Sequence, residues 1–218
     1  MVQLHIGIQM EKINIFATQY LRRQIFTVDN SQLEQNILHH QSENPGRKIS
    51  NHGGWQSRNI NFNSFSDEVT LLSDEILATS RALATSYRVS AKLIIGNLWF
   101  NVNGTGAFNA PHRHPNSLFS AVYYVNVPEG SGNIVFKNPN PLMYAHLTTD
   151  NLIAMNDINA TNWTVVPEPG MILVFPSWLE HYVEPNSSQE NRISVSYNIC
   201  AESTVHQFFT AFQNGDVA

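Results

Sequence analysis

The chain has 218 residues, of which 42% are hydrophobic and 13% are charged, so it is long enough to bury one full core. Its formal net charge of -5 leaves no basic face that could follow a phosphate backbone, which argues against nucleic acid as a partner. The single cysteine, Cys200, excludes an internal disulfide and a multi-cysteine metal site. We expect one domain spanning residues 1–218.

No targeting signal is expected. No apolar stretch approaches the roughly 20 residues of a membrane span, and residues 1–16 lack the charged start and long apolar run of a signal peptide. Cys200 lies in an apolar, strand-like run, where a buried and unreactive thiol is expected. These features predict a cytoplasmic protein without membrane association, and they are compatible with a homo-oligomer.

Residues 1–91 are predicted to form an N-terminal layer. A short helical pattern over 31–45 stops at Pro45, and the following segment, "GGWQS", reads as a loop holding one large aromatic residue. Trp55 and Gln56 of this loop either reach the mouth of a site or are simply buried beneath the loop. The clearest helix is expected near 66–88, with Ser66 as the N-cap and apolar residues recurring at the helical period.

From residue 92 the character changes to short apolar runs separated by glycine, proline and asparagine. About seven strands are expected, in "LIIGNLWFNVN", "LFSAVYYVNV", "NIVFKNP", "TNWTVV", "GMILVF", "HYVEP" and "RISVSYNICA". No helical pattern separates them, so the prediction is a mainly β, antiparallel jelly roll over 92–200 with the N-terminal helices packed outside. Residues 137–162 read as a long polar insertion of the kind that often covers a site, and 201–218 as a C-terminal extension.

Two histidines, His112 and His114, stand one residue apart within "NAPHRHPNS". In a strand this spacing places both imidazoles on one face. His181 follows a strand that ends in "FP", and Arg192 and Ser194 follow as "RIS". Oxygen activation at Fe(II) needs three protein ligands on one face and open positions beside them, and three histidines can supply that face. An arginine offers a planar fork to a carboxylate, and a serine hydroxyl two residues later adds a donor on the same face.

This order of residues resembles the signature of iron(II)- and 2-oxoglutarate-dependent oxygenases. In that family an H-x-(D/E) pair and a distant histidine hold Fe(II), an R-x-S pair binds the far carboxylate of 2-oxoglutarate, and all lie in a double-stranded β-helix. The segments "GGWQS", "HRHPN" and "SAVYYVNVPEGSG" look more narrowly like a little-studied subgroup, over roughly residues 50–200. The resemblance implies a dioxygenase of the hydroxylase type that uses Fe(II) and 2-oxoglutarate.

The chain departs from the common family pattern, because no Asp or Glu stands two residues after the first histidine. Either His112, His114 and His181 form a neutral three-histidine face like that of some cupin dioxygenases, or His114 and Asn116 replace the usual pair and His112 lies behind them. We favour the first. The resemblance also places Tyr124 against 2-oxoglutarate, with Tyr123 pointing the opposite way. Asn109 either positions the cosubstrate or serves a turn.

Two functions therefore remain: the oxygenase, acting on a small molecule or a protein side chain, and a cupin-like metal-binding protein without this cosubstrate. The pocket walls are expected to come from loops 45–65 and 137–162, whose residues match no recognition motif. The position of Arg192, inward or outward, separates the two functions.

Overall fold

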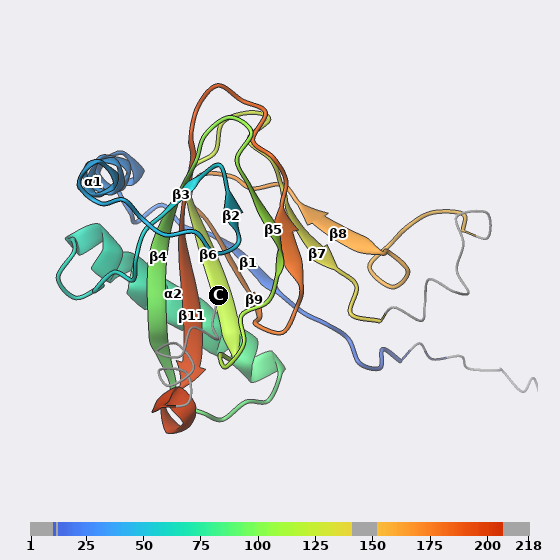
Figure 1. The fold of residues 1–218 in the computed structure, drawn as a ribbon. Helices are drawn as coiled ribbons and strands as arrows, with labels where there is room; N and C mark the ends of the chain where they lie inside the picture. The colour runs from blue at the N-terminus through green and yellow to red at the C-terminus, as the bar shows by residue number, and fades with distance from the viewer. Residues whose placement is uncertain (1–10, 12, 141–151, 207–218) are drawn as a thin grey trace, which may run out of the picture.

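Two antiparallel sheets face each other in the computed structural model, which describes residues 11, 13–140 and 152–206 (Figure 1). The large sheet has the order β1-β9-β6-β11-β4-β3, and the small sheet has the order β2-β5-β10-β7-β8. The large sheet comprises β1 (Leu21–Gln24), β9 (Met171–Pro176), β6 (Phe119–Asn126), β11 (Arg192–Ala201), β4 (Leu93–Asn103) and β3 (Trp55–Gln56). The small sheet comprises β2 (Asn51–His52), β5 (Phe108–His112), β10 (His181–Val183), β7 (Ile134–Lys137) and β8 (Asn162–Val165). The predicted mainly β jelly roll is confirmed.

Two helices cover the outer face of the large sheet, on the side away from β5, β7 and β8 (Figure 1). Helix α1 (Asn30–Glu43) packs against β6, and helix α2 (Asp67–Ser86) packs against β4 and β9. As predicted, Ser66 caps α2: its hydroxyl accepts a hydrogen bond from the backbone of Val69 at 3.3 Å. Neither helix has the length and apolar character of a membrane span in the described part of the chain.

The period-two alternation of the strands divides the apolar residues between two cores. On β6, Ala121, Tyr123 and Val125 join the core under the helices, whereas Val122 and Tyr124 lie between the sheets. The expected opposite orientation of Tyr123 and Tyr124 follows from this alternation. Each strand of the large sheet therefore presents every second residue to the space between the sheets.

All seven apolar segments predicted as strands are strands, from β4 and β6 to β11. The structure adds four to these seven: β5, which the histidine spacing implied but no apolar run indicated, and the short strands β1, β2 and β3 from residues before 92. Residues 1–91 therefore extend both sheets as well as supplying the two helices. The insertion 137–162 lies partly outside the described residues, as does most of the segment 201–218, in which Glu202–Thr204 form a single 3-10 turn.

Candidate metal and cosubstrate site

Three histidines converge between the sheets. His112 is the last residue of β5 and His181 is the first residue of β10, and these two are directly paired across the antiparallel strands. The possible ligand nitrogens of His112, His114 and His181 all lie within 4.8 Å of one another. In the described part of the chain this is the one group of three or more such side chains placed to hold a metal ion.

His114 reaches this cluster from a turn and not, as predicted, from the strand, because β5 ends at His112. The turn is fixed by its backbone: the N–H of His114 donates to the carbonyl of Ser177 at 3.0 Å, and its carbonyl accepts from the hydroxyl of Ser117 at 3.0 Å. Ser177 belongs to the segment that leads into His181. The loops that carry His114 and His181 are thus tied to each other.

Backbone carbonyls orient two of the imidazoles. The Nδ1–H of His112 donates to the carbonyl of Ala110 at 2.7 Å, and the Nδ1–H of His181 donates to that of Leu179 at 2.9 Å. With Nδ1 as the donor, the lone pair of each ring is on Nε2. The Nε2 atoms of His114 and His181 lie 3.4 Å apart. This arrangement of fixed Nδ1–H donors and converging Nε2 atoms is the one in which histidines bind metals.

Burial favours the neutral form of these imidazoles. The pKa of His181 is held well below its usual value, first by burial and then by the neighbouring His112 and His114. Burial also lowers the pKa of His112, and the nearby Glu180 carboxylate partly opposes this. Glu180 itself forms ion pairs with Arg113, at 3.2 Å, and with Lys137. The neutral imidazole is the form that binds a metal, so the donor set fits a divalent transition metal.

Arg192, Ser194 and Tyr124 line the same pocket. Arg192 is only 2% exposed, and its Nη1 donates to the carbonyl of Ser131 and lies 3.4 Å from those of Gly132 and Glu184. Ser194 lies two residues along β11, so its side chain is on the same face, and Tyr124 on β6 is its cross-strand partner. Arg192 therefore points inward, and the guanidinium is a buried cation beside neutral polar groups.

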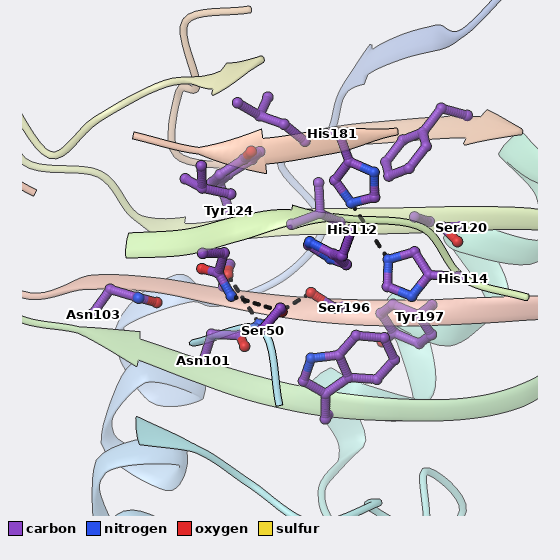
Figure 2. A pocket seen from close by; sticks show the side chains of 18 of the residues that line it. Ser50, Asn101, Asn103, His112, His114, Ser120, Tyr124, His181, Ser196 and Tyr197 are labelled. Atoms are coloured by element: carbon purple, nitrogen blue, oxygen red, sulfur yellow. Dashed lines mark hydrogen bonds between the residues drawn. The ribbon is translucent and has the colours of Figure 1, made fainter. Parts of the chain in front are cut away.

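The remaining wall of the pocket is neutral. Figure 2 shows His112, His114 and His181 grouped together, with Asn103 and Asn101 toward the other end of the pocket. Among the described lining residues Arg192 is the single permanently charged side chain. The other members are hydroxyls, amides and apolar groups, including Ser50, Trp99, Asn101, Asn103, Asn109, Ser120, Phe175 and Ser196.

Hydrogen bonds connect several of these neutral groups. Asn101 Nδ2 lies 3.0 Å from Ser196 Oγ and 3.4 Å from Ser194 Oγ, and Asn109 Nδ2 lies 3.3 Å from Ser50 Oγ. The sequence reasoning did not single out the inward residues of β4. The alternation of "WFNVN" could have identified them, since Trp99, Asn101 and Asn103 share one face of a strand.

Other residues singled out from the sequence lie elsewhere. Asn116 is exposed in the turn after His114, with a φ of 64°, and does not line the pocket. Trp55 does not reach the mouth of the pocket: its Nε1–H donates to the carbonyl of Asn44 at 2.9 Å, and its ring packs against the core under the helices. Cys200 is buried, as predicted, and burial raises the pKa of its thiol to about 12.

Residues 97–198 match a protein family described as "Putative 2OG-Fe(II) oxygenase". No curated protein sequence matches the chain. The match confirms the oxygenase resemblance seen in the sequence and the Fe(II) and 2-oxoglutarate that it implies. It does not test the narrower subgroup.

Solved structures share the fold. A prolyl-4-hydroxylase from Pseudomonas putida is 14% identical, with a TM-score of 0.59 over 85% of this chain and 94% of that one. The α-ketoglutarate-dependent epimerase SnoN from nogalamycin biosynthesis is 15% identical, with a TM-score of 0.61 over 84% and 79%. A 2OG-Fe(II) oxygenase-family protein from Burkholderia pseudomallei is 12% identical, with a TM-score of 0.56 over 83% and 84%. At these identities the likeness establishes the fold.

Proposed function

We infer that this chain, whose residues 97–198 match a family described as "Putative 2OG-Fe(II) oxygenase", is a dioxygenase of the hydroxylase type. One observation carries the inference: a converging histidine triad and a buried, inward-pointing arginine line one pocket. The reaction consumes O₂ and 2-oxoglutarate, inserts one oxygen atom into a C–H bond of the substrate, and releases succinate and CO₂. The second oxygen atom enters succinate.

In this proposal His112, His114 and His181 hold the iron. Bound Fe(II) supplies the activation of O₂ that drives decarboxylation and C–H oxidation. The protein holds the three rings in position through the carbonyls of Ala110 and Leu179 and through the backbone of His114. Asn116, exposed and outside the pocket, has no part in binding.

Arg192, Ser194 and Tyr124 receive the remote carboxylate of 2-oxoglutarate. Arg192 Nη1 is engaged by backbone carbonyls, and this fixes the guanidinium so that its other donors can meet the carboxylate. Burial raises the pKa of the Tyr124 phenol, so this group stays protonated and acts as a hydrogen-bond donor. The dianion is thereby held in one orientation, with its keto-acid end toward the histidines.

The substrate is a small molecule or a protein side chain. Its reacting part meets a wall in which the described residues are neutral apart from Arg192, so an uncharged group fits better than an unpaired ion. The net charge of -5 gives no support for a nucleic acid substrate. One buried cysteine is typical of a protein of the reducing cytoplasm, where this chain would act alone or as a homo-oligomer.

A second function has one observation in its favour. The triad contains no carboxylate, as in cupin-type sites that work without 2-oxoglutarate, and a metal-binding protein of that kind would retain the three histidines. It would have no use for a buried Arg192 pointing into the pocket. The arginine therefore favours the oxygenase.

The test is an anaerobic titration of the metal-free protein with Fe(II) and then 2-oxoglutarate, followed by absorbance. We expect one iron per chain and a visible charge-transfer band when 2-oxoglutarate is added. His181→Ala should lose both signals, because two remaining imidazoles bind iron weakly. The matched control is His52→Ala, which removes an exposed imidazole stacked on Phe108 outside the triad. Failure of the parent protein to bind iron, or iron binding without the band, would overturn the proposal.

A further inference from the structure

We propose that Asn103 is a further binding residue for the remote carboxylate of 2-oxoglutarate and that Gly54 positions it. The proposal rests on the function inferred above. It also gives a role to part of the "GGWQS" segment, which contributes no side chain to the lining of the pocket.

Asn103 is placed at the arginine end of the pocket. It is the last residue of β4 and the direct cross-strand partner of Arg192 on β11, and both side chains line the pocket. Directly opposed residues of an antiparallel pair have Cβ atoms about 4.5 to 5.5 Å apart. Figure 2 shows Asn103 at the end of the pocket away from His114, as expected for a residue that meets the far end of a metal-chelating ligand.

The amide of Asn103 has an unused donor. Asn103 is 2% exposed, and its Nδ2 has no hydrogen-bond partner among the described residues. The backbone carbonyl of Asn103, unlike its side-chain amide, has a partner: it accepts a hydrogen bond from Asn186 Nδ2 at 2.8 Å. A buried N–H without an acceptor is costly, so such a group points to an acceptor supplied by a ligand.

The neighbouring rung of the sheet makes the contrast clear. Asn101, two residues earlier on the same strand and the same face, has its Nδ2 directed at the hydroxyls of Ser194 and Ser196. Its amide is therefore engaged within the protein. Among the described asparagines that line the pocket, Asn103 is the one whose Nδ2 has no partner, and it shares its rung with the buried cation. An anionic oxygen is the acceptor that the Arg192 guanidinium would attract. A carboxylate has about four lone-pair positions, enough for the arginine and the amide together.

Gly54 leaves the room that the Asn103 amide occupies. A Cβ at position 54 would lie 2.8 Å from Asn103 Nδ2 and 3.2 Å from the carbonyl of Val102. The backbone of Gly54 is not in the left-handed region, so alanine is allowed there by its conformation. The closest contact is the end of a flexible side chain, and the Gly54→Ala change should therefore displace the amide while leaving the fold intact. Gly54 is also fixed in place, because its carbonyl accepts from Asn51 Nδ2 at 3.0 Å.

The experiment compares two keto acids on iron-loaded protein. 2-Oxoglutarate carries the remote carboxylate, and 2-oxopentanoate has the same carbon chain without it. Affinities are measured by anaerobic absorbance titration for the parent, Asn103→Leu and Gly54→Ala. A lost hydrogen bond to a charged acceptor should weaken 2-oxoglutarate binding about tenfold, and the affinity for 2-oxopentanoate should be unchanged.

Two further variants complete the test. Gly104→Ala is the control, the same glycine-to-alanine change on the other side of Asn103 in the chain: its Cβ would approach Asn191 Oδ1, at 3.2 Å, and the variant should bind 2-oxoglutarate like the parent. Asn103→Asp keeps the shape of the side chain and places a negative charge against the carboxylate, so it should weaken 2-oxoglutarate binding more than leucine does. Thermal unfolding of each variant checks that it is folded.

The possible results distinguish a failure of the Asn103 proposal from a failure of the oxygenase assignment on which it rests. Unchanged 2-oxoglutarate affinity in Asn103→Leu and Asn103→Asp, or an equal loss for both keto acids, would overturn the role of Asn103. If Arg192→Met still weakens 2-oxoglutarate binding, the oxygenase assignment survives that result. If the parent protein binds no 2-oxoglutarate, the assignment itself fails.

Discussion

Replacing Arg192 with methionine tests the cosubstrate site most directly. The methionine keeps much of the length and bulk of the arginine stem and removes the guanidinium. Arg192 is 2% exposed, and water therefore cannot take the place of its donors beside a bound carboxylate. The three carbonyls that its Nη1 now faces, those of Ser131, Gly132 and Glu184, belong to residues that do not line the pocket.

The expected loss can be worked from these contacts. A hydrogen bond to a charged group contributes about 1.5 to 3 kcal/mol, which is roughly a tenfold to hundredfold loss in affinity for 2-oxoglutarate. Iron binding should be retained, because His112 lies on β5, His181 on β10 and His114 in the turn after β5, and none of them is on β11 with Arg192. Loss of donors to the backbone carbonyls lowers stability, and removal of a buried cation partly offsets this, so the thermal midpoint should fall by a few degrees at most.

The measurement is a titration of 2-oxoglutarate into iron-loaded parent and Arg192→Met, with Arg192→Lys as the control. Lysine retains the charge but offers a point donor in place of a planar fork. The affinity of Arg192→Lys for 2-oxoglutarate should therefore lie between those of the parent and Arg192→Met. Equal affinities in the parent and Arg192→Met, with iron bound in both, would refute the reasoning and leave the metal-binding jelly roll as the better account of the chain.

Two further outcomes follow from the positions of Asn116 and Cys200. Asn116→Gly removes the amide while keeping the left-handed backbone (φ 64°), so iron affinity should equal that of the parent, and a marked loss would show that Asn116 is a ligand. Cys200 is 1% exposed and has a pKa of about 12, so iodoacetamide at pH 8 should leave the folded protein unlabelled and add one equivalent in denaturant. Rapid labelling of the folded protein would contradict its burial.

Much of the β core could be predicted from the sequence, because its strands are apolar runs interrupted by glycine and proline. The segment "SAVYYVN" shows the limit of this signal, since the run predicts β6 but its burial on both faces hides which residues face the site. Strand β5 was not among the predicted apolar segments, because "FNAPH" contains a proline and two polar residues, and only the histidine spacing pointed to it. Strands β1, β2 and β3 are two to four residues long and lie at sheet edges, where local sequence carries little strand signal.

The sequence indicated which residues of the candidate site lie together, and their roles stay a prediction, but it did not indicate the geometry that brings them together. The spacing of His112 and His114 suggested one strand face, yet His114 lies in a turn that Pro115 and the left-handed Asn116 help to form. Its ring reaches the cluster through backbone hydrogen bonds to a loop more than sixty residues later, and a local pattern does not reveal such contacts. Trp55 illustrates the same limit, since its hydrogen bond to Asn44 depends on how helix α1 ends.

A triad without a carboxylate changes the charge balance of the pocket. Three neutral imidazoles leave a divalent ion its full charge, and the dianion of 2-oxoglutarate would then make the centre neutral, with Arg192 as an additional positive charge. Attraction at the metal would therefore strengthen cosubstrate binding, whereas its orientation would depend on Arg192 and the neutral donors beside it. Imidazole ligands also bind Cu(II) and Zn(II) more tightly than Fe(II). Selection of iron over these metals must therefore come from the metals available in the cell or from the bound 2-oxoglutarate. For the same reason, activity measurements require protein that has been stripped of metal and reloaded with Fe(II) without oxygen.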